Sequence, residues 1–197
     1  MAIETFISRE KIHKTNLDLA KQICRDYEGQ DVIFVGILNG SFMFCADLVR
    51  ACFEVGGLSS ASVEFMGASS YGDGTESSGE LNITLDLKRD IKDKNVIIVE
   101  DIVDTGLTLS KLLKVLEKRS PKTLKLASLL YKPARNVHEV NINYLGIEIE
   151  DKFVIGYGLD YAGKYRELPF IGVYSENWAK WKLSLIHIWR CRRSAVC

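Results

Sequence analysis

The segment from Val96 to Ser110 places acidic and hydroxyl side chains in an order that can bind a sugar phosphate. Glu100 and Asp101 follow directly after an apolar run, and the turn sequence Asp-Thr-Gly-Leu-Thr, residues 104–108, follows after two further apolar residues. Adjacent carboxylates can accept hydrogen bonds from a diol. A turn that opens into a helix offers free backbone N–H groups and a positive dipole end, which favour a phosphate. The pattern therefore predicts a sugar on the two acids and a phosphate on the turn.

The residues around these side chains predict the elements that hold them. Residues 96–99, Val-Ile-Ile-Val, form a run without a polar face, as expected of a central parallel strand covered on both sides. Leu109, Leu112 and Leu116 have the spacing of an apolar helix stripe. The acids should thus lie at the carboxyl end of a strand, where open α/β sheets bind ligands. An acid, a threonine and a glycine after a strand can also simply cap a helix, and on their own they leave that alternative open.

The rest of the chain predicts alternating strands and helices. The predicted helices cover residues 12–27, 42–52 and 109–116. The predicted strands cover residues 32–38, 61–66, 83–87, 96–99, 123–130, 144–149, 153–158 and 169–173, with a Gly/Ser-rich connection over 68–79. Such alternation predicts an α/β fold with a doubly wound, mainly parallel sheet.

The composition favours a globular protein with a small-molecule ligand. The chain has 197 residues, 47% of them hydrophobic, and its 26 basic and 26 acidic residues cancel. This balance gives no basic footprint for nucleic acid or for an anionic membrane. The N-terminus lacks the apolar core of a signal peptide and no run is long enough to span a bilayer, so we expect a cytoplasmic protein. The five cysteines have no Cys-x-x-Cys spacing, so we expect buried thiols, without a zinc site or a disulfide framework.

The end of the chain differs in character from everything before it. Residues 183–197 mix an apolar run with Arg190, Arg192 and Arg193. We expect residues 1–182 to form a single domain and residues 183–197 to be a non-native or disordered tail. A basic amphipathic membrane anchor is the alternative for these residues.

The acidic segment also resembles a known family signature. Four apolar residues, Glu-Asp, two apolar residues and Asp-Thr-Gly-x-Thr closely resemble the phosphoribosyl pyrophosphate motif of the type I phosphoribosyltransferases. No lysine follows Gly106, so the segment is not a Walker A loop. Within that superfamily, residues 5–180 resemble the hypoxanthine and hypoxanthine-guanine phosphoribosyltransferases. The resemblance implies the type I phosphoribosyltransferase fold, with a small hood above the sheet.

The resemblance assigns a pyrophosphate loop and a mobile loop. Leu38, Asn39 and Gly40 resemble the loop whose backbone N–H groups face the pyrophosphate, and Asn39 replaces the family's usual lysine. This change removes an ammonium group, whereas Gly40 keeps a close approach possible. Ser70 and Tyr71 resemble residues of the loop that closes over bound substrates and meets the pyrophosphate. An ordinary Asn-Gly turn and a passive surface loop are the respective alternatives.

The resemblance also assigns residues to the purine and to the metal. Lys132 resembles the lysine that donates a hydrogen bond to O6 of a 6-oxopurine. Phe153 resembles the aromatic residue whose ring stacks on the base. The backbone of Val154 resembles the group that contacts the Watson–Crick edge of the base. Asp160 resembles a magnesium-site aspartate, and Arg166 resembles an arginine that holds pyrophosphate. Pattern alone favours a core position for Phe153 and a surface position for Lys132, and it leaves a surface ion pair as an alternative for Asp160 and Arg166.

Together these assignments predict a purine-salvage enzyme that transfers the 5-phosphoribosyl group from phosphoribosyl pyrophosphate to N9 of hypoxanthine or guanine. Asp104 would act as the general base, and Mg²⁺ would be held by Glu100, Asp101 and Asp160 with the substrate's oxygens. The predicted substrate-binding residues are Leu38, Asn39, Gly40, Ser70, Tyr71, Glu100, Asp101, Asp104, Thr105, Gly106, Leu107, Thr108, Lys132, Phe153, Val154, Asp160 and Arg166. The resemblance further implies a homodimer or homotetramer. A xanthine-preferring or orotate-type transferase and a non-catalytic regulator that senses phosphoribosyl pyrophosphate are the alternatives.

Overall fold

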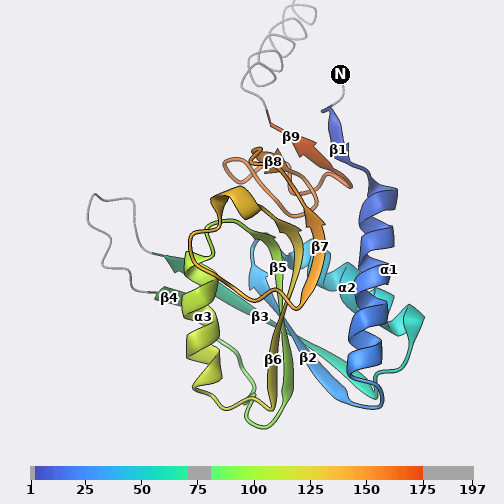
Figure 1. Cartoon of the computed structure of the whole chain (residues 1–197), viewed down its shortest axis with the longest axis vertical. Coiled ribbons are helices and arrows are strands. Elements are labelled where there is room, and N and C mark those ends of the chain that lie inside the picture. Colours follow the sequence, from blue (N-terminus) through green and yellow to red (C-terminus); the bar gives the residue numbers. More distant parts are fainter. Residues whose placement is uncertain (1–2, 71–80, 175–197) are drawn as a thin grey trace, which may run out of the picture.

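The structure, a computed structural model, describes residues 3–70 and 81–174 and contains two β-sheets (Figure 1). The larger sheet has six strands in the order β4-β3-β2-β5-β6-β7, and the smaller has three in the order β1-β9-β8. The elements are β1 (Thr5–Ile7), α1 (Arg9–Asp26), β2 (Asp31–Leu38), α2 (Phe42–Val55), β3 (Ser60–Ser70), β4 (Leu81–Leu85), β5 (Asn95–Val103), α3 (Leu107–Glu117), β6 (Thr123–Tyr131), the 3-10 turn η1 (Pro133–Arg135), β7 (Tyr144–Glu148), β8 (Val154–Ile155) and β9 (Ile171–Val173).

The large sheet is parallel except at one edge. β3, β2, β5, β6 and β7 pair in parallel, and β4 joins β3 in the antiparallel direction. β2 and β5 are its central strands, and their side chains are buried almost throughout because helices cover both faces. The described helices are too short or too polar to cross a membrane.

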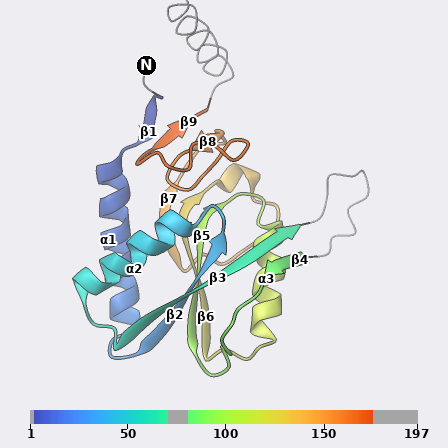
Figure 2. The ribbon, with the colours of Figure 1, turned by 180° about the vertical axis from the view of Figure 1, so that it is seen from behind.

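Two apolar cores lie on opposite faces of this sheet (Figures 1 and 2). α1 and α2 pack over one face, where Leu19, Leu48 and Phe34 are buried in the same apolar core. α3 covers the other face through Leu112 and Leu116. Helices on both faces of a mainly parallel sheet confirm the predicted doubly wound α/β fold.

The small antiparallel sheet forms a hood above the large one (Figure 1). The prediction of one strand over residues 153–158 was wrong in extent, because only Val154–Ile155 forms a strand and it pairs with β9. Gly156, Tyr157 and Gly158 all have positive φ angles, a geometry that ends a strand. β1 was not predicted, since three residues carry too little periodicity to be recognised.

Other boundaries also differ from the predictions. β3 continues through residues 68–70, which were predicted to be a connection, and β5 continues through Glu100 and Asp101 to Val103. α1 begins at Arg9, three residues before the predicted start, because Ser8 caps it by accepting a hydrogen bond from the Lys11 amide. The buried free thiols of Cys24, Cys45 and Cys52 agree with the prediction for those cysteines. The predicted tail, 183–197, lies outside the described residues.

Candidate active site

The candidate site lies where the connections from β2 and β5 diverge. β2 leads through α2 to β3 on one side, and β5 leads through α3 to β6 on the other. The pairing of β5 with β2 ends at Gly36–Val99, whereas its pairing with β6 continues to Val103–Tyr131. From Glu100 onward, β5 therefore has a neighbour on only one side. This is the topological switch point at which doubly wound sheets bind ligands.

Two adjacent carboxylates project from β5 at this opening. Asp101 is 9% exposed, and Glu100 Oε2 is a buried atom without a hydrogen-bond partner among the described residues. Burial raises the pKa of Asp101 to about 6, a rise that the nearby Arg166 partly opposes. Burial, and then the charge of Asp101, raise the pKa of Glu100 well above its ordinary value. Two acids kept from water in this way form a site that a cation or hydroxyl donor would satisfy.

A close backbone approach joins the loop after β2 to this acid pair. A Cβ atom on Gly40 would collide with the Asp101 carboxylate, lying 2.5 Å from its Cγ atom. A Cβ atom on Gly158 would likewise collide with the Gly40 carbonyl oxygen. The peptide bond between Leu38 and Asn39 is cis, and the Asn39 side chain faces the exterior of the protein, since the residue is exposed. Both glycines are thus required for the loop, the acid and the turn after β8 to pack together.

Asp160 and Arg166 form an ion pair beside that turn. Arg166 Nη2 lies 2.7 Å from Asp160 Oδ1, and Arg166 Nη1 donates to the Gly158 carbonyl at 2.5 Å. Asp160 Oδ2 accepts a hydrogen bond from the Gly163 amide at 2.7 Å. The arginine and aspartate side chains remain partly exposed, at 27% and 30%. The guanidinium group is therefore fixed by the backbone close to the acids, and it contributes positive potential to Asp101.

The turn after β5 is held in place by the chain after β6. Gly106 has a φ of 77°, and a Cβ atom there would collide with the His138 carbonyl oxygen. The Thr105 carbonyl accepts hydrogen bonds from the amides of Val137 and His138 at 3.2 and 3.0 Å. α3 begins at Leu107, so Leu107 and Thr108 belong to its first turn. The prediction had placed both residues in the loop before the helix. The N–H groups of this first turn have no partners within the helix and can bind an anion.

Asp104 and Lys132 each have an ion-pair partner that the sequence did not reveal. Arg135 Nε lies 2.7 Å from Asp104 Oδ1, a buried oxygen that accepts no well-aligned hydrogen bond. Lys132 Nζ lies 3.5 Å from Asp151 Oδ1, and the lysine side chain is only 8% exposed. Lys132 is therefore a buried cation and not the surface lysine that remained an alternative.

Phe153 presents an exposed aromatic face beside the hood. The residue is 52% exposed, which excludes the core position that its apolar pattern also allowed. Tyr161 and Tyr174 lie edge-on to the Phe153 ring, with centroids 5.9 and 5.8 Å away, and stack on each other at 4.2 Å. The neighbouring Val154 is buried. An open ring supported by two others is suited to stacking on a planar ligand.

Three comparisons with known proteins agree with this geometry. The model of the phosphoribosyl transferase domain matches residues 8–162. The chain is 46% identical over 172 residues to a hypoxanthine phosphoribosyltransferase of Escherichia coli K12, covering 86% of this chain and 94% of that protein. It is 43% identical over 178 residues to a hypoxanthine-guanine phosphoribosyltransferase of Dictyostelium discoideum, covering 90% and 98%. The crystal structure of a hypoxanthine-guanine phosphoribosyltransferase from Bacillus anthracis superimposes with a TM-score of 0.81 at 42% identity, covering 88% of this chain and 100% of that one.

The chain belongs to the hypoxanthine-guanine phosphoribosyltransferase family. In this phosphoribosyltransferase, the structure brings together several of the residues that the sequence predicted for the site. Gly40, Asp101, Asp160 and Arg166 lie around the open end of β5, and Asp104 lies in the adjoining turn. The backbone of Ser70 lies in β3, paired with Leu81, and Tyr71 lies outside the described residues. Arg135 and Asp151, the ion-pair partners of Asp104 and Lys132, were not among the predicted residues.

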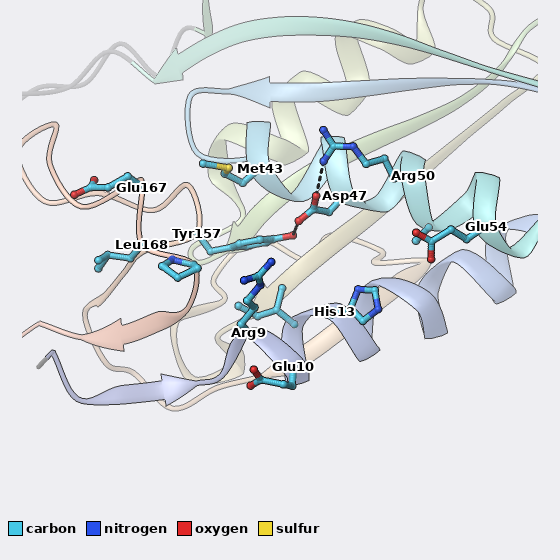
Figure 3. Close-up of a pocket in the computed structure, with 13 residues that line it drawn as sticks. Arg9, Glu10, His13, Met43, Asp47, Arg50, Glu54, Tyr157, Glu167 and Leu168 are labelled. Carbon is cyan, nitrogen blue, oxygen red and sulfur yellow. Dashed lines mark hydrogen bonds and ion pairs between the residues drawn. The ribbon is translucent and has the colours of Figure 1, made fainter.

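The phosphoribosyltransferase also has a pocket away from these residues (Figure 3). It has a volume of about 710 Å³ and is lined by α1, α2 and the chain around Tyr157 and Leu168. Tyr157 donates a hydrogen bond to Asp47 Oδ2 at 2.8 Å and accepts one from Asn16 Nδ2 at 3.0 Å. None of the predicted substrate-binding residues lines it. The Tyr157 contacts fasten the turn after β8 to both helices, so we interpret this region as support for the site.

Proposed function

We propose that the chain transfers the 5-phosphoribosyl group from phosphoribosyl pyrophosphate to N9 of hypoxanthine or guanine, forming IMP or GMP and pyrophosphate. The observation that supports this most directly is the acid pair at the switch point, where Asp101 is buried against Gly40 and Glu100 has a buried Oε2 atom without a hydrogen-bond partner among the described residues. The chain belongs to a family of purine-salvage enzymes that transfer a glycosyl group, and this membership indicates that the acid pair binds a sugar. The carboxylates would accept hydrogen bonds from the ribose 2′- and 3′-hydroxyls, and the first turn of α3 would bind the 5′-phosphate.

Mg²⁺ fits the oxygen ligands near the acid pair. The described residues contain no cluster of three acidic, histidine or cysteine side chains that would hold a metal alone. Glu100, Asp101 and Asp160 would therefore hold the ion together with oxygens of the substrate and water, as Mg²⁺ commonly prefers. When bound, the ion offsets the negative charge that develops on the leaving pyrophosphate. The unpartnered Glu100 Oε2 atom is consistent with a cation or a metal-bound water there.

The transfer needs positioning and one proton acceptor. The bond between C1′ and the pyrophosphate oxygen breaks, the bond between N9 and C1′ forms, and the proton on N7 of the base leaves to Asp104. Lys132 would donate to O6, the Val154 backbone would contact the Watson–Crick edge, and Phe153 would stack on the ring. Pyrophosphate would be bound by N–H groups of the Leu38–Gly40 loop and of Arg166. Asn39 would add no positive charge to this loop. Ser70 and Tyr71 would close over the bound pyrophosphate.

We further propose that the protein acts in the cytoplasm as a homodimer or homotetramer, with residues 1–182 as its single domain and residues 183–197 as a dispensable tail. No nucleic acid or membrane partner is needed for this activity. The balanced charge of 26 basic and 26 acidic residues supports this part of the proposal.

The experiment is a Mg²⁺-dependent assay with phosphoribosyl pyrophosphate and each of hypoxanthine, guanine, xanthine and adenine, following the nucleotide by absorbance. Lys132 is a donor, so a base with the O6 acceptor should react and adenine, which carries an amino group there, should not. A preference for xanthine would contradict the proposed specificity for hypoxanthine or guanine. Binding of phosphoribosyl pyrophosphate without product from any base would favour the non-catalytic regulator.

A further inference from the structure

The chain that follows β6 contacts the site at several points. Lys132 directly follows the strand, Arg135 lies in η1, and the amides of Val137 and His138 donate hydrogen bonds to the Thr105 carbonyl. These last contacts leave no room for a side chain on Gly106. The segment 132–138 thus packs directly against the turn that carries Asp104.

Charged side chains of alternating sign connect Asp104 to Lys132. Arg135 Nε lies 2.7 Å from Asp104 Oδ1, and Arg135 Nη1 lies 3.7 Å from Asp151 Oδ1. The same Asp151 oxygen lies 3.5 Å from Lys132 Nζ. We call these four residues, Asp104, Arg135, Asp151 and Lys132, the charge row. Asp151 joins its halves, because one of its oxygens faces both cations.

We infer that Arg135 and Asp151 are positioning residues that set the distance and orientation between Asp104 and Lys132. This inference rests on the proposed function, in which Asp104 faces N7 of the purine and Lys132 faces O6. These two atoms lie on the same edge of the base, so the carboxylate and the ammonium must be held at a fixed separation to contact both. The charge row provides that constraint through side chains that do not themselves touch the base.

The pair of Arg135 with Asp104 and the pair of Asp151 with Lys132 each have a geometry that can hold the group facing the purine. Arg135 lies at Oδ1 of Asp104, and among the described residues no ion-pair partner faces the Oδ2 atom, which would receive the N7 proton. Two different nitrogens of the Arg135 guanidinium group face Asp104 and Asp151, a geometry that the single ammonium group of a lysine would not reproduce. Lys132 is 8% exposed, and a buried ammonium needs a counter-charge to stay in place. Asp151, 49% exposed, supplies that charge and remains partly hydrated itself.

An ordinary pair of surface charges would behave differently. Such pairs contribute roughly 0.2–1 kcal/mol to stability. Their loss should not change kcat and KM by different factors. Arg119 offers a matched control, since its Nη2 atom lies 2.8 Å from Asp86 Oδ2 and neither residue belongs to the predicted site. Arg119→Gln removes an ion pair of similar length without touching the charge row.

The test measures steady-state kinetics of the full-length enzyme with hypoxanthine and phosphoribosyl pyrophosphate. We expect Arg135→Gln to lower kcat about tenfold, with the KM for phosphoribosyl pyrophosphate changed less than about twofold. Arg135→Lys, which keeps the charge without the fork, should recover part of kcat. In an Asp104→Asn background, Arg135→Gln should have less than about a twofold effect, because Arg135 acts through that carboxylate.

Asp151→Asn tests the other half of the row. We expect it to raise the KM for hypoxanthine about fivefold and to have a smaller effect in a Lys132→Ala background. If the wild-type enzyme is active and Arg135→Gln behaves like Arg119→Gln, the inference is wrong while the proposed function stands. Equal effects of Arg135→Gln with and without the Asp104 carboxylate would also overturn it. If the wild-type protein forms no nucleotide from any base, the proposed function fails and the inference fails with it.

Discussion

Asp101→Asn should stabilise the ligand-free protein above neutral pH while it impairs the enzyme. Burial raises the pKa of Asp101 from its ordinary value of 3.8 to about 6 in the folded protein. The folded state therefore binds a proton more tightly than the unfolded state, and the free energy of unfolding falls as the pH rises through this interval. Each tenfold change in proton affinity corresponds to about 1.4 kcal/mol. The full cost of the Asp101 charge is then about 3 kcal/mol.

The magnitude accessible to experiment lies between about pH 5 and pH 8. For these two pKa values, roughly 1–2 kcal/mol of the cost develops in that range. The Asp101→Asn variant has no charge at this position, so it should gain about this much relative to wild type over the same interval. The variant should gain further stability through Glu100, because removing the charge of Asp101 removes one cause of the raised pKa of Glu100.

The assay is urea unfolding of both proteins at about pH 5 and pH 8, with activity measured on the same samples. Comparing the two pH values cancels any effect of the amide group that does not depend on pH. Activity should fall, since Asp101 is proposed to hold the ribose hydroxyls and Mg²⁺. If the stability difference between variant and wild type is the same at both pH values, the Asp101 charge carries no burial cost and our interpretation of the acid pair is wrong.

Three further substitutions test separate parts of the site. Gly40→Ala should lower kcat/KM about a hundredfold, because the new Cβ atom would collide with the Asp101 carboxylate; steady-state kinetics would show it. Lys132→Ala should raise the KM for hypoxanthine more than the KM for phosphoribosyl pyrophosphate, measured with each substrate varied in turn. Tyr157→Phe should lower the free energy of unfolding by roughly 1–3 kcal/mol in urea, because it removes the hydroxyl that bridges Asn16 and Asp47.

Controls and contrary results are available for each. Gly29→Ala strains the backbone at a φ of 66° but brings its Cβ atom near no other group, so kcat/KM of the folded enzyme should stay unchanged, and a similar loss there would argue against the collision at Gly40. Lys122→Ala alters an exposed lysine and should leave both KM values unchanged. Equal weakening of both substrates by Lys132→Ala would contradict a contact to O6. An unchanged unfolding midpoint for Tyr157→Phe would show that the bridge does not support the fold.

The sequence predicted the sheet and the acid pair because their signals are local. The β-branched run 96–99 is buried on both faces, as its lack of a polar side indicated. Glu100 and Asp101 lie within β5 and not beyond its end, yet the predicted opening begins there, because the pairing with β2 stops at Val99. Strand pairing on one side only is a tertiary property that no run of residues displays.

Features that depend on contacts between distant segments could not be predicted. Residues 153–158 have the apolar composition of a strand, but Tyr157 with a φ of 51° follows Gly156, and the chain turns after Ile155. Arg135 follows Lys132 and Pro133 with no pattern that indicates Asp104 as its partner. Phe153 has a core-like pattern in the sequence and is half exposed in the structure, and only the family resemblance assigned it to an accessible site. In each case packing in three dimensions decides a position that local propensity leaves open.

The most direct test of the account is the formation of IMP from hypoxanthine and phosphoribosyl pyrophosphate by wild-type protein and Asp104→Asn, with binding of phosphoribosyl pyrophosphate measured on both. We predict that the wild type forms IMP and pyrophosphate in equal amounts, and that Asp104→Asn binds phosphoribosyl pyrophosphate as well but turns over about a hundredfold or more slowly. Equal turnover by the two proteins would remove Asp104 from its role as base. Binding without IMP formation by the wild type would contradict the proposed transferase activity itself.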